Sequence, residues 1–118
     1  MNRTLKNASL NKLMKTMDKC IAKRELLLIK PDGKESVVTL RIGRPYKVDD
    51  LQWSCPVEME GFHKKLADQS GNDSFQSLML AQKLIRDLLK YHIEDGGQVL
   101  SVEDRSRINI TDLFESGI

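Results

Sequence analysis

The stretch from residue 74 to residue 94 most constrains the fold, because its apolar side chains recur with the period of an α-helix. One broad side of this helix would carry Leu78, Ala81, Leu84, Ile85, Leu88 and Leu89, and the other would carry Lys83, Arg86, Lys90 and Glu94. Asp73 or Ser74 can cap its start, and the glycines after Asp95 can end it. We therefore expect a long amphipathic helix with one face packed on a sheet.

The residues before this helix have the pattern of antiparallel strands. "AKRELLLIK" and "ESVVTLRIG" flank the turn "PDGK", whose proline and glycine favour a hairpin. After a polar loop at 45–51, "QWSCPVEME" predicts a third strand and "FHKKLADQ" a fourth; "QVLSV" predicts a short strand after the helix. The pattern predicts an α+β fold, in which a four-stranded antiparallel meander carries the long helix across one face.

Residues 8–22 predict a second amphipathic helix, at the N-terminus. Its apolar face would carry Leu10, Leu13, Met14, Met17 and Ile21, and its basic face Lys12, Lys15, Lys19 and Lys23. The apolar face needs a cover, and we expect it to serve as an interface, either with the sheet or with a second copy. The expected organisation is a basic helix at 1–21, a ββββα core at 22–102, and a tail at 103–118 with a short helix capped by Thr111.

Composition restricts the class of protein. With 118 residues, 40% apolar and 31% charged, the chain is expected to form one globular domain. It has no apolar run long enough to cross a membrane and only two cysteines, which favours a reduced, cytoplasmic setting. Residues 1–24 carry a net charge of +6 and the remainder −4, so nucleic-acid binding by the basic N-terminal segment is one alternative function.

Three blocks resemble a known family. "RIGRPY", "W-S-CPVEMEG" and "G-N-DSFQSLMLAQKLI", in this order, resemble a family of small bacterial domains of unknown function, over roughly residues 22–100. The resemblance implies a four-stranded sheet with one long helix. It supplies no catalytic residues to transfer.

Cysteine and histidine offer little catalytic chemistry. Cys55 could act as a nucleophile only beside a base, and the candidates His63 and His92 are not placed near it by the sequence. Cys55 alternates with Trp53 and Val57, so we expect a buried structural thiol and a core tryptophan. Two separate histidines and two separate cysteines give no zinc spacing, and no metal site or cofactor is expected.

Three arginines and a tyrosine are the remaining candidates for binding. Arg24, Arg41, Arg44 and Tyr46 could hold a carboxylate or a phosphate, because a guanidinium binds such anions with paired hydrogen bonds. We expect Arg41 instead to pair with Glu58 or Glu60 on an adjacent strand. The sequence thus favours a non-enzymatic protein-interaction or assembly domain, expected as a homodimer. Binding of nucleic acid or an anionic ligand through Lys12, Lys15, Lys19, Arg41 and Arg44 is the alternative, and an enzyme using Cys55 is a remote one.

Overall fold

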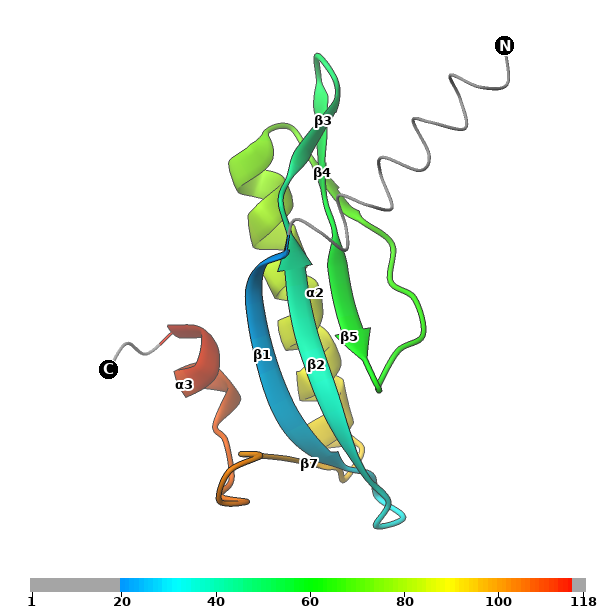
Figure 1. Ribbon diagram of the computed structural model, residues 1–118, viewed down its shortest axis with the longest axis vertical. Helices are drawn as coiled ribbons and strands as arrows, with labels where there is room; N and C mark the ends of the chain where they lie inside the picture. The colour runs from blue at the N-terminus through cyan, green and yellow to red at the C-terminus, as the bar shows by residue number, and fades with distance from the viewer. Residues whose placement is uncertain (1–19, 116–118) are drawn as a thin grey trace.

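The computed structural model describes residues 20–115, which form two antiparallel sheets and two helices (Figure 1). The larger sheet has the order β5-β2-β1-β7, from strands Val57–Glu60, Glu35–Gly43, Cys20–Ile29 and Gln98–Leu100. The smaller sheet has the order β3-β4-β6, from strands Tyr46–Asp49, Gln52–Cys55 and Gln69–Gly71. The helices are α2, Ser74–Glu94, and α3, Ile110–Glu115. The expectation of an α+β fold with antiparallel strands and one long helix is confirmed.

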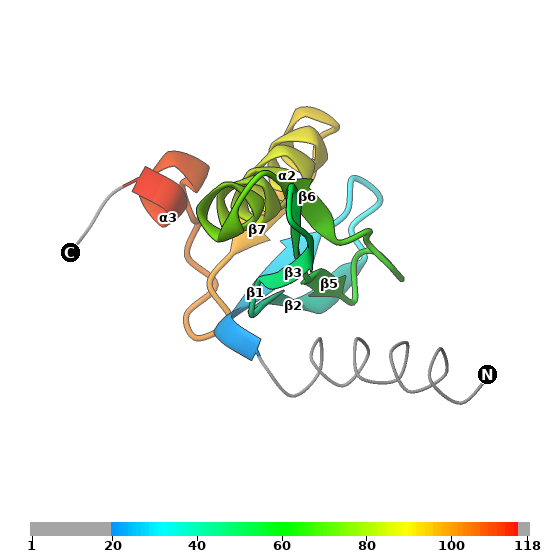
Figure 2. The same ribbon diagram turned by 90° about the horizontal axis from the view of Figure 1, so that it is seen from above.

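Helix α2 begins and ends where the sequence predicts. The side chain of Asp73 accepts a hydrogen bond from the backbone N–H of Gln76 at 2.7 Å, which satisfies one of the free donors of the first turn. Ala81, Ile85 and Leu89 are buried, in agreement with the predicted apolar side. Figure 2 shows that α2 crosses one face of the larger sheet and that α3 lies on the same side.

The core lies between this face and α2. Alternate residues of β1 and β2 point into it, because successive side chains of a strand face opposite ways. The buried residues that the larger sheet contributes to this core are Leu26, Leu28, Val38, Leu40, Ile42, Val57, Met59 and Val99. Burying each such side chain stabilises the fold by about 1.5–3 kcal/mol. Ile110 closes the core beside α2, where Arg86 and Glu115 form an ion pair at 2.5 Å.

The predicted four-stranded meander is wrong in three places. "QWSCPVEME" is two strands of two different sheets, because Pro56 cannot donate a ladder hydrogen bond and divides β4 from β5. Residues 46–49, predicted as a loop, form β3, and residues 62–68, predicted as a strand, have only one isolated bridge, from Met59 to His63. The sheet instead gains β7, which pairs with β1.

The expected N-terminal helix lies mostly outside the described residues. Its end is wrong, because Cys20, Ile21 and Ala22 belong to β1. Ile21, expected on the apolar face of that helix, is 54% exposed on the strand. The expected cap of the C-terminal helix is also wrong: the side chain of Asn109, not Thr111, accepts the backbone N–H of Asp112 at 3.2 Å.

Trp53 is not the expected core anchor. It is only half-buried and does not belong to the core cluster, whereas Cys55, two residues later, is fully buried within it. The reason is the position of β4, which belongs to the smaller sheet and not to the larger sheet that faces α2. Gly71 of β6 faces Trp53 in register and touches the start of α2, where a Cβ atom would lie 2.7 Å from the backbone nitrogen of Ser77.

Candidate functional site

The most prominent open feature of the described chain is one edge of β1. On one side, β1 pairs with β2 along almost its whole length. On the other side, β7 pairs only with Leu27, Leu28 and Ile29. Within residues 20–115, no strand pairs with the remaining edge, from Cys20 to Leu26. An unpaired strand edge of this length offers its backbone to another strand.

Hydrogen bonds around β7 show which residues of β1 face this edge. The backbone N–H of Ile108 donates to the backbone oxygen of Val99, and the backbone N–H of Ser101 donates to the backbone oxygen of Ser106. The backbone N–H and C=O groups of Val99 and Ser101 therefore point away from β1. The backbone groups of Leu100, which lies between them, point toward β1. The backbone groups of its partner Leu27 point toward β7. Because backbone direction alternates along a regular strand, the N–H and C=O groups of Lys23 and Glu25 also point out of the edge.

Side chains at the edge carry charge on both faces of the sheet. Lys23 and Glu25 lie on the same face as Leu27, the one opposite α2, because they are two and four residues away from it. Arg24 lies on the α2 side. All three charged residues are exposed. They line a groove of about 530 Å³ together with Val102 and Glu103.

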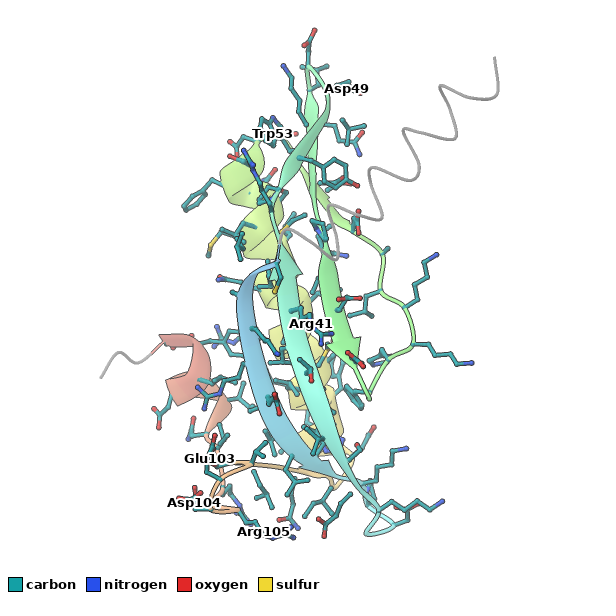
Figure 3. The ribbon with its side chains drawn as sticks, in the orientation of Figure 1. Arg41, Asp49, Trp53, Glu103, Asp104 and Arg105 are labelled. Atoms are coloured by element: carbon teal, nitrogen blue, oxygen red, sulfur yellow. The ribbon has the colours of Figure 1, made fainter. Side chains whose placement is uncertain are left out.

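The other wall of this groove is the loop that follows β7, in which Figure 3 shows Glu103, Asp104 and Arg105 gathered. Arg105 binds both carboxylate oxygens of Glu35 at 2.9 and 3.1 Å, which ties the loop to the start of β2. The hydrogen bond that the Ser101 hydroxyl donates lowers the pKa of Glu103, and the charge of Arg24 lowers it further. The Glu103 carboxylate is therefore charged at neutral pH and attracts Arg24.

Arg41 lies on the outer face of the larger sheet and is already paired. Its guanidinium donates to Glu60 at 2.5 Å and lies 3.8 Å from Glu58, both on β5 (Figure 3). The predicted cross-strand pairing is confirmed. An incoming anion would have to compete with two carboxylates.

Tyr46 and Arg44 do not join Arg41 in a common site. The Tyr46 hydroxyl donates to Asp68 at 2.5 Å in the smaller sheet, and burial together with this carboxylate raises the pKa of Tyr46. Arg44 is exposed in the short link between β2 and β3. Lys12, Lys15 and Lys19, with Leu10, Leu13, Met14 and Met17, lie outside the described residues.

Cys55 has a structural environment. Its thiol is fully buried, donates to the backbone oxygen of Gly43 at 3.4 Å, and has its pKa raised by burial to about 11. His92, the buried histidine, is bonded through Nε2 to the oxygen of Gln98 at 3.1 Å. The tight packing of Gly97 on the His92 ring, where a Cβ atom would lie 2.3 Å from it, fixes that ring in place.

Residues 20–115 contain neither a metal-binding cluster nor a membrane-spanning helix. No group of three or more histidine, cysteine, aspartate or glutamate side chains is arranged to hold a metal ion there. No helix in that part of the chain is both long and apolar enough to span a membrane.

Comparison with known proteins identifies the family. The model of a domain of unknown function, DUF6968, matches residues 22–111. The chain belongs to this family. The matched range contains the whole β1 edge from Ala22 onward and the loop that faces it. No curated protein and no solved structure matches the chain.

The sequence pattern placed Lys23 on a helix face and offered Arg24 as a possible anion ligand, and it did not indicate that these two residues and Glu25 form an open strand edge. The available signal was the length of the strand pattern, whose second half is continuous leucine and isoleucine and whose first half is charged. When only half of a strand has apolar side chains on both of its faces, we expect other parts of the protein to cover both faces in that half alone. That signal indicates an open end, but not which side of the strand lacks a partner.

Proposed function

We propose that the chain is a non-enzymatic protein-interaction or assembly domain that accepts a strand from another polypeptide at the open edge of β1. The observation that carries the proposal is that β7 covers only the last three residues of this ten-residue strand. The bacterial, cytoplasmic setting expected from the sequence is part of this proposal.

Strand addition suits this edge for a physical reason. Each backbone N–H or C=O group that a partner strand pairs exchanges water for a protein hydrogen bond, with a net gain of about 0.5–1.5 kcal/mol. Main-chain bonds of this kind give affinity, and neighbouring side chains give selectivity. Here the neighbouring side chains are charged, and the groove beside them has a second wall at Val102 and Glu103. A charged edge selects a partner of complementary charge.

The two alternatives have weaker support. Binding of nucleic acid or an anionic ligand would use the basic N-terminal segment, most of which lies outside the described residues, together with Arg44 and Arg41. Arg41 is already engaged with Glu58 and Glu60. An enzyme would use Cys55, whose thiol is buried and has a raised pKa, the reverse of what an activated nucleophile needs. Protein interaction at the β1 edge requires neither group to change its contacts.

Proline at position 25 tests the proposal. The N–H of Glu25 points out of the edge, so Glu25→Pro removes an outward donor and leaves the bonds to β2 intact, which is where proline is tolerated in a sheet. A photoreactive phenylalanine analogue at Ile21 would report crosslinks to other chains in the cells that encode the protein. We expect discrete adducts with the native Glu25 and with Glu25→Ala, and at least about a tenfold loss with Glu25→Pro, which corresponds to about 1.4 kcal/mol.

The same probe at Tyr91 is the matched control. Tyr91 is 58% exposed at the far end of α2, and its adducts should not depend on residue 25. Thermal melts of the three chains would verify that each is folded. Adducts at Ile21 that are equally strong with proline and with alanine at position 25 would show that the edge is not the binding surface.

A further inference from the structure

We infer that the strand accepted at this edge is β1 of a second copy of the chain, paired antiparallel across a two-fold axis that passes through Arg24. This inference rests on the proposed function and names its partner. The paired segment runs from Ala22 to Leu26 of each copy, because β7 already occupies the edge of β1 from Leu27 onward. The arrangement joins two four-stranded sheets into one continuous sheet, in which each copy supplies the same surface.

The charge order of the edge carries the inference. An antiparallel two-fold at Arg24 places Lys23 of one copy directly opposite Glu25 of the other, and Glu25 opposite the other Lys23. Lys23 and Glu25 are also the residues whose backbone groups face the edge, so each of these pairs exchanges two hydrogen bonds, giving about four in all. Backbone bonding and side-chain charge therefore specify the same register. Registers centred on Lys23 or Glu25 would oppose like charges.

The one like-charge contact in this register is already compensated. Arg24 of each copy lies opposite Arg24 of the other, on the α2 side of the sheet. Glu103 lines the same groove as Arg24, and the Arg24 charge contributes to the lowered pKa of this carboxylate after the larger effect of Ser101. Each arginine thus carries its own counter-charge into the interface. The loop with Glu103 is held by Arg105 and Glu35, so the counter-charge needs no rearrangement.

Charge exchange on the full chain tests the register. In Lys23→Glu the pairs become Glu–Glu, and in Glu25→Lys they become Lys–Lys, so each variant alone should dimerise about tenfold more weakly or worse. An equimolar mixture of the two restores opposite charges at both pairs, and so does the double variant K23E/E25K with itself. The measurement is sedimentation equilibrium over a range of protein concentrations at low and high salt.

Dimerisation of the native chain, its loss in each single variant, and its recovery in both the mixture and the double variant would support the inference. A native chain that stays monomeric at every concentration would overturn it, as would a dimer that K23E and E25K leave unchanged. If the native chain stays monomeric but its crosslinks still depend on residue 25, the proposed function would stand with a different partner. Crosslinks that do not depend on residue 25 would remove both, and the three charges would then serve to keep other strands away from the edge.

Discussion

At the scale of single residues, the two cysteines have opposite environments. Cys20 is exposed at the start of β1, whereas Cys55 is fully buried beside Gly43. Because the thiolate is the reactive form, burial and a pKa of about 11 together make Cys55 a poor nucleophile at neutral pH. The same environment makes it a reporter of unfolding.

Thiol labelling of the native chain should therefore modify Cys20 rapidly and Cys55 slowly. The Cys20→Ser variant isolates the second thiol, and we expect its labelling to stay slow up to about pH 10, since the raised pKa keeps the thiol protonated. Denaturant should expose it at once. Fast labelling of native Cys20→Ser at neutral pH would contradict the structural role and favour an activated thiolate.

At the scale of elements, α2 shows that a periodic apolar pattern predicts the position of a helix well but predicts poorly which of its side chains are fully buried. Leu89 is fully buried, whereas its neighbour Leu88, predicted on the same apolar side, is only partly buried against the core. The apolar side of the sequence is broader than the strip that the sheet covers. Leu89→Ala should therefore cost about 2–5 kcal/mol of unfolding free energy, because it leaves a cavity at a fully enclosed site.

Chemical denaturation of Leu89→Ala and Leu88→Ala side by side measures this difference. Leu88→Ala is the matched control, since it removes the same atoms from a partly solvated site, and its midpoint should fall less. Equal losses in the two variants would mean that α2 is rotated about its axis relative to the described packing.

The strands show where sequence information ends. Period-2 alternation runs through "QWSCPVEME" without interruption. Pro56 is a local signal of a break in the strand, but it does not indicate that the two halves belong to different sheets. The hairpin before it had a readable signal: the side chain of Asp49 accepts from the backbone N–H of Leu51 at 2.8 Å, which is a typical aspartate turn. Which strand pairs with which depends on the packing of residues distant in sequence, such as Leu27 on Leu100, and no short pattern encodes it.

At the scale of the whole molecule, the larger sheet has one face covered by α2 and α3, and no described helix covers the other (Figure 2). That open face is mixed rather than apolar: Val37 is 51% exposed, but ionic pairs of Arg41 with Glu60 and of Arg105 with Glu35 surround it. A face of this kind is stable in water. The edge of β1, whose backbone groups lack partners within residues 20–115, is the stronger candidate for assembly.

Two surfaces therefore compete as the source of a homodimer, the β1 edge and the apolar side predicted for the N-terminal segment. Charging that side with the double substitution Met14→Glu and Met17→Glu in the full chain separates them, because neither position belongs to β1. We expect this variant to keep the molar mass of the native chain in size-exclusion chromatography with light scattering, and Lys23→Glu to lower it. The reverse result, a dimer that survives Lys23→Glu and is lost when Met14 and Met17 are charged, would assign the assembly to the N-terminal segment, because a methionine-rich apolar side adapts readily to a second copy of itself.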